Sequence, residues 1–252
     1  MYKIQYMTNP IIPNLSVDCV VFGFDSKDLN VLLVERTLIN EKNNTIVFSD
    51  FTLTGNHVQA GEDPDDAAVR ILNDLTGLHN IYLEQFRTFG STGRLMHEKD
   101  QLWIRSLGLN IADHVITVGY YSLIDCTSVE ITNHLSRNVR WFPVSNLPEL
   151  AFDHAEIFEK ALERLRLKLM QEPIGFELLA EKFTLTQVQR LYEAILGTKF
   201  DPRNFRKKLS QMKYLIPLDE WQTAVPHKPA QLYIFSRDVY ERTRKERYDF
   251  LI

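Results

Sequence analysis

Residues 55–78, GNHVQAGEDPDDAAVRILNDLTGL, constrain the fold more than any other stretch of the chain. They predict a glycine-containing loop that leads directly into a helix over 64–76. Asp63 suits the N-cap, Pro64 suits the first helical position, and Gly77 suits the stop after the last turn. A short strand over 51–54 is expected to enter the loop.

The segments around this helix predict a sheet. Residues 15–24 and 29–36 are rich in Val and Leu, and the polar stretch 25–28 between them is typical of a β-hairpin. Further strands are expected at 81–89, 115–124 and 139–142. A second helix is predicted to start after Asp153, to follow helical apolar spacing to about Met170, and to end before Pro173. We therefore predict two domains, 1–171 and 172–252.

Composition supports a globular protein whose two parts differ in charge. Hydrophobic residues make up 44% of the 252 residues and charged residues 25%. Residues 172–252 carry 14 basic and 11 acidic side chains, whereas 1–171 carry 15 basic and 22 acidic ones, giving +3 against −7. Cys19 and Cys126 lie in apolar runs and are expected to be buried thiols. We expect a cytoplasmic protein, because the chain shows neither a secretory signal nor a membrane span.

The second part predicts short helices followed by two strands. Helices are expected at 174–182, at a segment opened by a Thr186–Gln189 capping box and closed at Gly197, and from Asp201 to about Tyr214. Strands are expected at 215–224 and 231–235, joined by a proline-containing loop. This order of elements is that of a winged helix-turn-helix.

The helix predicted over 202–214 divides by face. Phe205, Leu209 and Met212 fall on one side, and cations with a hydroxyl fall on the other, which suits a helix that docks on a core and reads DNA. A basic face is also common on plain solvated surface, so this reading depends on the winged-helix order. The candidate DNA contacts, here and in the predicted wing, are Arg203, Asn204, Arg206, Lys207, Ser210 and Lys228.

The 55–78 segment resembles the Nudix box of the Nudix hydrolase superfamily. Counting from Glu62, seven residues lead to Arg70, and Gly77 falls in place. The resemblance implies that the three metal-binding carboxylates of the family correspond to Ile71, Asp74 and Leu75. Two aliphatic residues cannot hold Mg²⁺, which needs oxygen ligands, so we expect no enzyme activity, no metal and no cofactor. Glu62 and Arg70 are expected to form a structural ion pair.

Residues 172–209 and the helix around 150–166 resemble the Nudix-related transcriptional regulators, in particular the arabinose-responsive repressors of that family. The resemblance implies an α+β chain with an N-terminal Nudix-like α/β/α sandwich, its sheet mixed, and a C-terminal winged helix-turn-helix. It also implies a homodimeric repressor that leaves a palindromic operator when a small sugar effector binds the Nudix-like domain. We expect that effector to be L-arabinose.

A sugar is bound by converging polar groups, often beside an aromatic face. Six residues are candidates for this role: Arg36, Asn56, His57, Arg94, Trp103 and His154. Two other functions stay open at this point. The chain could be a Nudix-type hydrolase of ADP-ribose-like nucleoside diphosphate derivatives, or an inactive adaptor that binds protein through its winged helix.

Overall fold

The computed structural model describes residues 10–40, 42–77, 79, 81–107, 114–126, 138–223 and 228–246. They fall into two compact units. The first comprises 1–22, 30–123 and 130–162, and the second comprises 23–29, 124–129 and 163–252. No helix among the described residues is long and apolar enough to cross a membrane.

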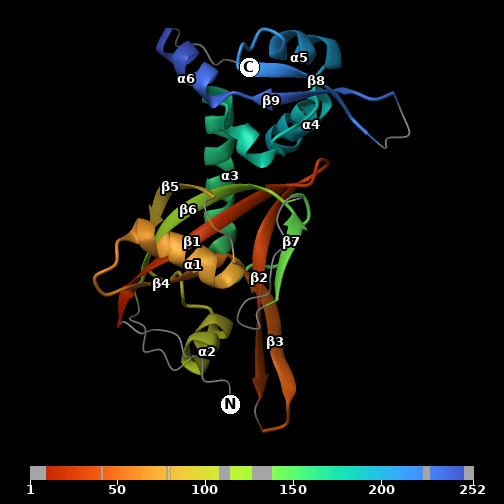
Figure 1. The fold of residues 1–252 in the computed structure, drawn as a ribbon. Helices are drawn as coiled ribbons and strands as arrows, with labels where there is room; N and C mark the ends of the chain where they lie inside the picture. The colour runs from red at the N-terminus through yellow and green to blue at the C-terminus, as the bar shows by residue number, and fades with distance from the viewer. Residues whose placement is uncertain are drawn as a thin grey trace. The chain divides into compact units, whose positions relative to one another are not determined.

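The first unit is built on a seven-stranded sheet (Figure 1). Strands run in the order β3-β2-β1-β6-β5, with β4 paired to β1 and β7 paired to β2. Their bounds are β1 Ile11–Phe24, β2 Leu29–Asn40, β3 Thr45–Thr52, β4 Thr54–Gln59, β5 Tyr82–Phe89, β6 Ile116–Asp125 and β7 Val139–Pro143. All the expected strands are present, although the one expected at 51–54 is divided between β3 and β4.

Helices cover this sheet on both sides. Figure 1 shows α1 (Pro64–Thr76) in front of the sheet and the first half of α3 (His154–Gln171) behind it. In α1 the Asp63 side chain accepts from the backbone N–H of Asp65, and Gly77 adopts φ 73°, as expected. Behind the sheet, Phe158 of α3 contacts Phe22 of β1, with ring centroids 6.0 Å apart. The structure thus shows the expected α/β/α arrangement.

The second unit contains a short 3-10 helix η2 (Ile174–Leu178), α4 (Leu185–Leu196), α5 (Pro202–Leu209), the two-stranded ribbon β8 (Leu215–Trp221) and β9 (Gln231–Phe235), and α6 (Arg237–Glu246). Its core is aromatic: Phe176 stacks on Phe235 at 4.7 Å, and Tyr192 contacts Phe205 at 5.7 Å. The expected winged-helix order is present.

Several boundaries differ from the expectations. The α5 helix ends at Leu209 and not near Tyr214, and the segment expected to be a helix over 174–182 forms only η2. The capping box lies at Thr184 and Gln187, two residues before the predicted pair. Helix α2 (Glu98–Ser106) occupies a stretch that showed no helical pattern.

Both cysteines are free thiols. Cys19 is fully buried, and Cys126 is half-buried. Burial raises the pKa of both, to about 11 for Cys126, so neither is a reactive thiolate at neutral pH.

Candidate effector site and nucleic-acid interface

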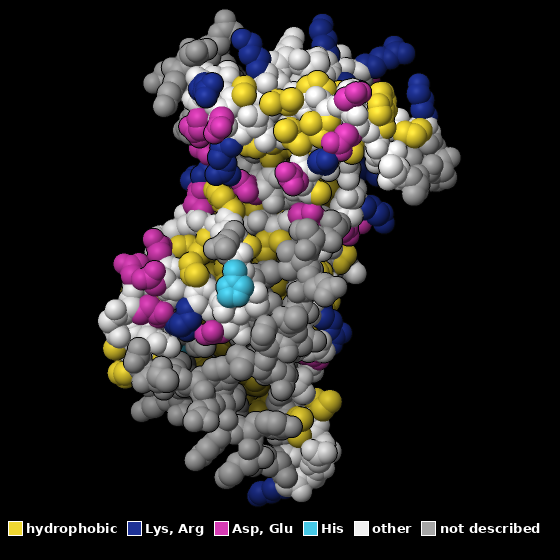
Figure 2. All heavy atoms as spheres, in the orientation of Figure 1, with side chains coloured by type: hydrophobic (Ala, Val, Ile, Leu, Met, Phe, Trp, Pro, Cys, Tyr) yellow, Lys and Arg dark blue, Asp and Glu magenta, His cyan; other side chains and the backbone are white. Residues whose placement is uncertain are grey.

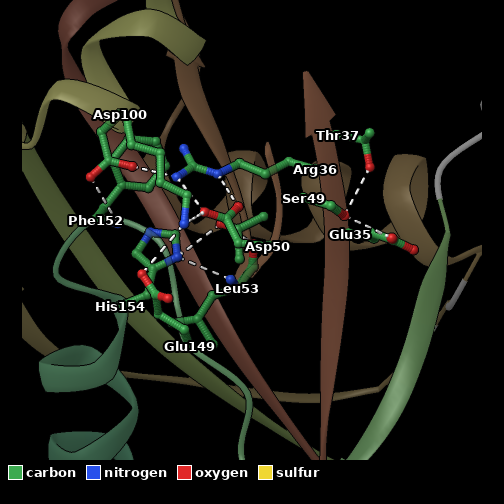
Figure 3. A network of polar contacts seen from close by, with 12 residues as sticks. Glu35, Arg36, Thr37, Ser49, Asp50, Leu53, Asp100, Glu149, Phe152 and His154 are labelled. Atoms are coloured by element: carbon green, nitrogen blue, oxygen red, sulfur yellow. Dashed lines mark hydrogen bonds and ion pairs between the residues drawn. The ribbon is translucent and has the colours of Figure 1, made fainter. Parts of the chain in front are cut away.

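Arg36 lies at the centre of a buried charge cluster (Figure 3). Cross-strand register places it opposite Asp50, and its Nε and Nη2 donate to the two oxygens of that carboxylate at 2.5 and 3.0 Å. Nη2 also donates to Asp100 of α2. Burial favours a raised pKa for Asp50, but hydrogen bonds from Arg36 and Lys99 outweigh it and lower that pKa. The Asp50 carboxylate is therefore charged at neutral pH.

One nitrogen of this guanidinium is left over. Arg36 is only 2% exposed, yet its Nη1 has no hydrogen-bond partner within the part of the chain that the structure describes. A buried charged donor without a partner is costly, so such a group is suited to receive an oxygen from a ligand.

Aromatic rings surround the same guanidinium. Its central carbon lies 4.6 Å from the ring of Phe152, 5.2 Å from Phe48 and 5.8 Å from Trp103. Phe152 has φ 55°, a left-handed conformation that is strained for a bulky side chain. Its backbone N–H donates to Asp100 at 3.2 Å, so the ion pair and the strained turn are linked.

Asp18 of β1 connects a second group of charges. One of its oxygens accepts from the Thr117 hydroxyl at 2.7 Å and lies 3.7 Å from Arg94 Nη2. Arg94 in turn donates to both oxygens of Asp153, at 2.9 and 2.7 Å. The other oxygen of Asp18 lies 3.4 Å from His154 Nε2. A single carboxylate within an apolar strand thus joins three segments that are far apart in sequence.

The partners of His154 identify its tautomer. The backbone N–H of Leu53 donates to Nδ1 at 3.0 Å, so Nδ1 carries no proton in the neutral ring. Nε2 therefore carries the proton and points it at Asp18. Burial lowers the pKa of His154, which keeps the ring neutral at physiological pH.

The six residues predicted to contact the effector fall into two groups. Arg36, Arg94, Trp103 and His154 lie in the clusters around Arg36 and Asp18, and the rings of Phe152 and His154 join these clusters at 5.2 Å. His57 is buried on β4, where its Nδ1 contacts the Leu15 carbonyl. The side-chain Oδ1 of Asn56 accepts from the backbone N–H of His57, and Asn56 shows no described contact to either cluster. All six stay predictions.

Several residues of these clusters were not among the sequence candidates, including Asp18, Asp50, Asp100, Phe152 and Asp153. Asp18 had a signal, because it is a lone carboxylate within the apolar run LSVDCVVFGF. Asp100 ends the polar segment 91–100, which the sequence marks as a candidate lining of the effector site, whereas Asp153 had no signal because its partner Arg94 is distant in the chain.

The Nudix-box positions form an ion pair instead of a carboxylate face. Arg70 donates to both oxygens of Glu62, at 2.6 and 2.7 Å, and to the His57 carbonyl at 3.2 Å. Ile71 is 1% exposed, while Asp74 is solvent-exposed and lies 3.8 Å from Arg70. The Leu75 side chain lies outside the described residues. Within the described ranges, no three His, Cys, Asp or Glu residues are arranged to hold a metal ion.

The second unit presents cations on α5. Phe205 and Leu209 are buried, whereas Arg203, Arg206 and Lys207 are exposed. Figure 2 shows Lys and Arg side chains projecting from the surface of this unit. Of the remaining candidates, Asn204 is exposed, Ser210 is the C-cap of α5, and Lys228 is exposed between β8 and β9. Arg206 also donates to Thr186 of α4 at 3.3 Å. These six residues are polar or charged and lie where the sequence predicted them, on or at the end of α5 and between β8 and β9. Their contact with DNA stays a prediction.

Gly55 tests how tightly the Asp18 cluster is packed. A Cβ there would lie 3.0 Å from both the Val17 carbonyl oxygen and Asp18 Cγ, and closer still to one Asp18 oxygen. We expect Gly55→Ala to lower the free energy of unfolding by about 1–3 kcal/mol, as overpacking does. Gly90→Ala is the control in urea denaturation, because its Cβ would meet nothing nearer than 3.4 Å. Equal stability of the two variants would contradict the tight packing.

The buried histidines predict a dependence of stability on pH. Burial lowers the pKa of His154 and His57 in the folded chain, whereas an unfolded histidine titrates near ~6.5. The unfolded state therefore takes up more protons, and stability is lost as the pH falls through about 6.5. We expect urea denaturation between about pH 7.5 and 5.5 to show this loss. His154→Gln should reduce this loss of stability, and His97→Gln, at an exposed position, is the control that should leave it unchanged. The same pH dependence in the wild-type chain and both variants would show that His154 does not cause it.

Comparison with known protein families gives a separate match for each of the two units. The NUDIX domain family matches residues 13–163, and the NrtR DNA-binding winged helix domain matches residues 175–235. The chain is 28% identical over 233 residues to the ADPR responsive transcriptional repressor NtrR of Acinetobacter baylyi, covering 91% of this chain and 84% of the relative.

Two further relatives show the range of similar proteins. The structure of Shewanella oneidensis NrtR complexed with a 27mer DNA is similar with a TM-score of 0.66 and 27% identity, covering 90% of this chain and 95% of that one. An ADP-ribose pyrophosphatase of Methanocaldococcus jannaschii is 28% identical over 148 residues, which is 58% of this chain and 72% of the relative. Because the NUDIX match spans more than half of the sequence, the chain belongs to the Nudix family and joins its Nudix domain to an NrtR-type DNA-binding winged helix.

Proposed function

We propose that the chain is a homodimeric transcriptional repressor whose Nudix domain binds a small sugar, L-arabinose, and thereby releases the winged helix from a palindromic operator. The DNA-binding role is supported mainly by the exposed cationic face of α5. This helix follows the capped helix α4 in a domain that matches the NrtR DNA-binding winged helix family. The A. baylyi relative, itself described as a repressor, supports the regulatory role.

The charge of the candidate effector site favours a neutral ligand. Arg36, Arg94 and Lys99 are already paired with carboxylates, and the four aspartates Asp18, Asp50, Asp100 and Asp153 outnumber these cations. A diphosphate would meet this excess of negative charge, whereas sugar hydroxyls can donate to carboxylates and accept from Arg36 Nη1, which has no partner among the described residues. The rings of Phe152 and Trp103 offer apolar faces for a sugar.

ADP-ribose is the competing effector, because the A. baylyi relative is described as ADPR responsive. Hydrolysis of ADP-ribose-like compounds is the alternative function, and the M. jannaschii relative with its pyrophosphatase activity favours it. The buried Ile71 argues against that function, since an aliphatic side chain stands where a metal ligand is needed.

DNA binding is tested by removing one cation from α5. We expect Lys207→Ala to weaken binding to a duplex carrying the palindromic element near neighbouring sugar-utilisation genes, and to reduce the salt slope by roughly 1. Fluorescence anisotropy across a salt series measures both. Lys199→Ala is the matched control, because Lys199 is 89% exposed in the same unit and pairs with Glu193. Indistinguishable behaviour of the two variants would remove α5 from the interface.

The effector response is tested at Arg36. Arg36→Lys keeps the charge but loses the fork, so we expect at least about a tenfold higher L-arabinose concentration for release of the operator, with unchanged DNA affinity in the absence of sugar. Arg140→Lys is the control, since Arg140 pairs with Glu35 outside the cluster. A normal response in a folded Arg36→Lys protein would place the effector elsewhere, and release by ADP-ribose alone would identify the other ligand.

A further inference from the structure

The turn between β1 and β2 belongs to the second unit, although most of both strands belongs to the first. Residues 23–29 group with the second unit, whereas Asp18 of β1 and Arg36 of β2 lie in the first. The two strands are therefore a covalent connection from the charge clusters to the winged-helix unit. Residues 17–24 and 29–34 are all buried, so the strands are firmly packed and suited to carry a displacement along their length.

The turn itself is held in one conformation. The side chain of Asp25 accepts from the backbone N–H groups of Lys27 and Asp28, at 2.9 and 2.7 Å. Ser26, at the start of this turn, adopts φ 74°, a left-handed conformation that is uncommon for a residue with a side chain. The turn thus presents the half-buried side chain of Ser26 in a fixed place at the end of the hairpin.

The Ser26 hydroxyl contacts the residue that caps α4. Gln187 Nε2 donates to Ser26 Oγ at 3.3 Å, while Gln187 Oε1 accepts from the backbone N–H of Thr184 at 2.8 Å. The two ends of one side-chain amide therefore join the hairpin turn to the capping box. A shift of Ser26 either breaks this hydrogen bond or pulls on the first turn of α4.

The same turn of α4 also contacts α5. Thr186, which precedes Gln187, accepts a hydrogen bond from Arg206 at 3.3 Å. Only this short stretch of α4 therefore lies between the hairpin turn and a guanidinium that is expected to reach DNA. The far end of α4 is held separately, since Arg166 of α3 donates to the Ile195 carbonyl at 2.8 Å. A pull on the first turn thus acts on a helix whose other end is anchored.

We propose that Ser26 and Gln187 are positioning residues that connect effector binding in the Nudix domain to the placement of Arg206 on DNA. This inference rests on the repressor of the proposed function and names the residues through which its response passes. A ligand that contacts Arg36 or Asp18 displaces one of the two strands, the turn moves with it, and its hydrogen bond to α4 is altered. Two sites are coupled when both bias the same element, and the first turn of α4 is that element.

The test compares the operator Kd with and without ligand, by fluorescence anisotropy with L-arabinose and, in parallel, with ADP-ribose. Ser26→Gly removes the hydroxyl, and glycine adopts the left-handed φ freely, so the turn is retained. We expect the ligand-induced change in the operator Kd to shrink at least about threefold, as the loss of one hydrogen bond allows. The affinity of the free chain for the ligand, measured by calorimetry, should stay that of the wild type.

Two further variants separate a positioning role from a general weakening of a turn. Ser26→Asn tolerates the same backbone conformation and offers an amide oxygen to Gln187, so it should restore the response. Asn44→Gly is the matched control, because Asn44 also has a positive φ, 55°, and is exposed in the turn between β2 and β3. This control should respond as the wild type does.

The outcomes distinguish this inference from the proposed function. A Ser26→Gly chain that releases the operator as the wild type does overturns the positioning role and leaves the repressor standing. A response that is lost in Ser26→Gly and not restored in Ser26→Asn overturns it too, because the hydrogen bond is then not the cause. A wild-type chain that neither ligand releases from the operator overturns the proposed effector response, and the positioning role with it.

Discussion

The fork of Arg36 between Asp50 and Asp100 is the interaction on which the Nudix domain's interior depends. A buried guanidinium destabilises a fold unless it is paired, and here the β2–β3 register supplies one carboxylate and α2 supplies the other. Asp100 also receives the backbone N–H of the strained Phe152. The pairing thus positions a strand, a helix and a turn, and Arg36 Nη1 remains without a hydrogen-bond partner among the described residues.

The second cluster surrounds a buried carboxylate of β1 with partners in the same way. Asp18 is buried because Arg94, His154 and Thr117 surround it, and Gly55 makes room for it. In the Nudix box the helix α1 buries Ile71, and Arg70 pairs with Glu62. We infer that the domain retains its fold and uses its concentrated charge for recognition.

Local signals in the sequence predicted much of the fold. Asp63 with Gly77, and Asp201 with Pro202, marked helix ends correctly because capping depends on neighbouring residues. The capping box was ambiguous, since Thr184 and Thr186 are both followed by Gln three residues later. Apolar spacing continues to Met212, yet α5 ends earlier because the chain turns there into β8.

The candidate site was harder to predict because its pairs are long-range. Arg94 and Asp153 are 59 residues apart, and only the folded sheet brings them together.

Calorimetric titration of the wild-type chain with L-arabinose and with ADP-ribose tests whether this carboxylate-rich cluster recognises a neutral sugar. We expect saturable binding of L-arabinose and much weaker binding of ADP-ribose. Tight binding of ADP-ribose with no heat from L-arabinose would contradict it.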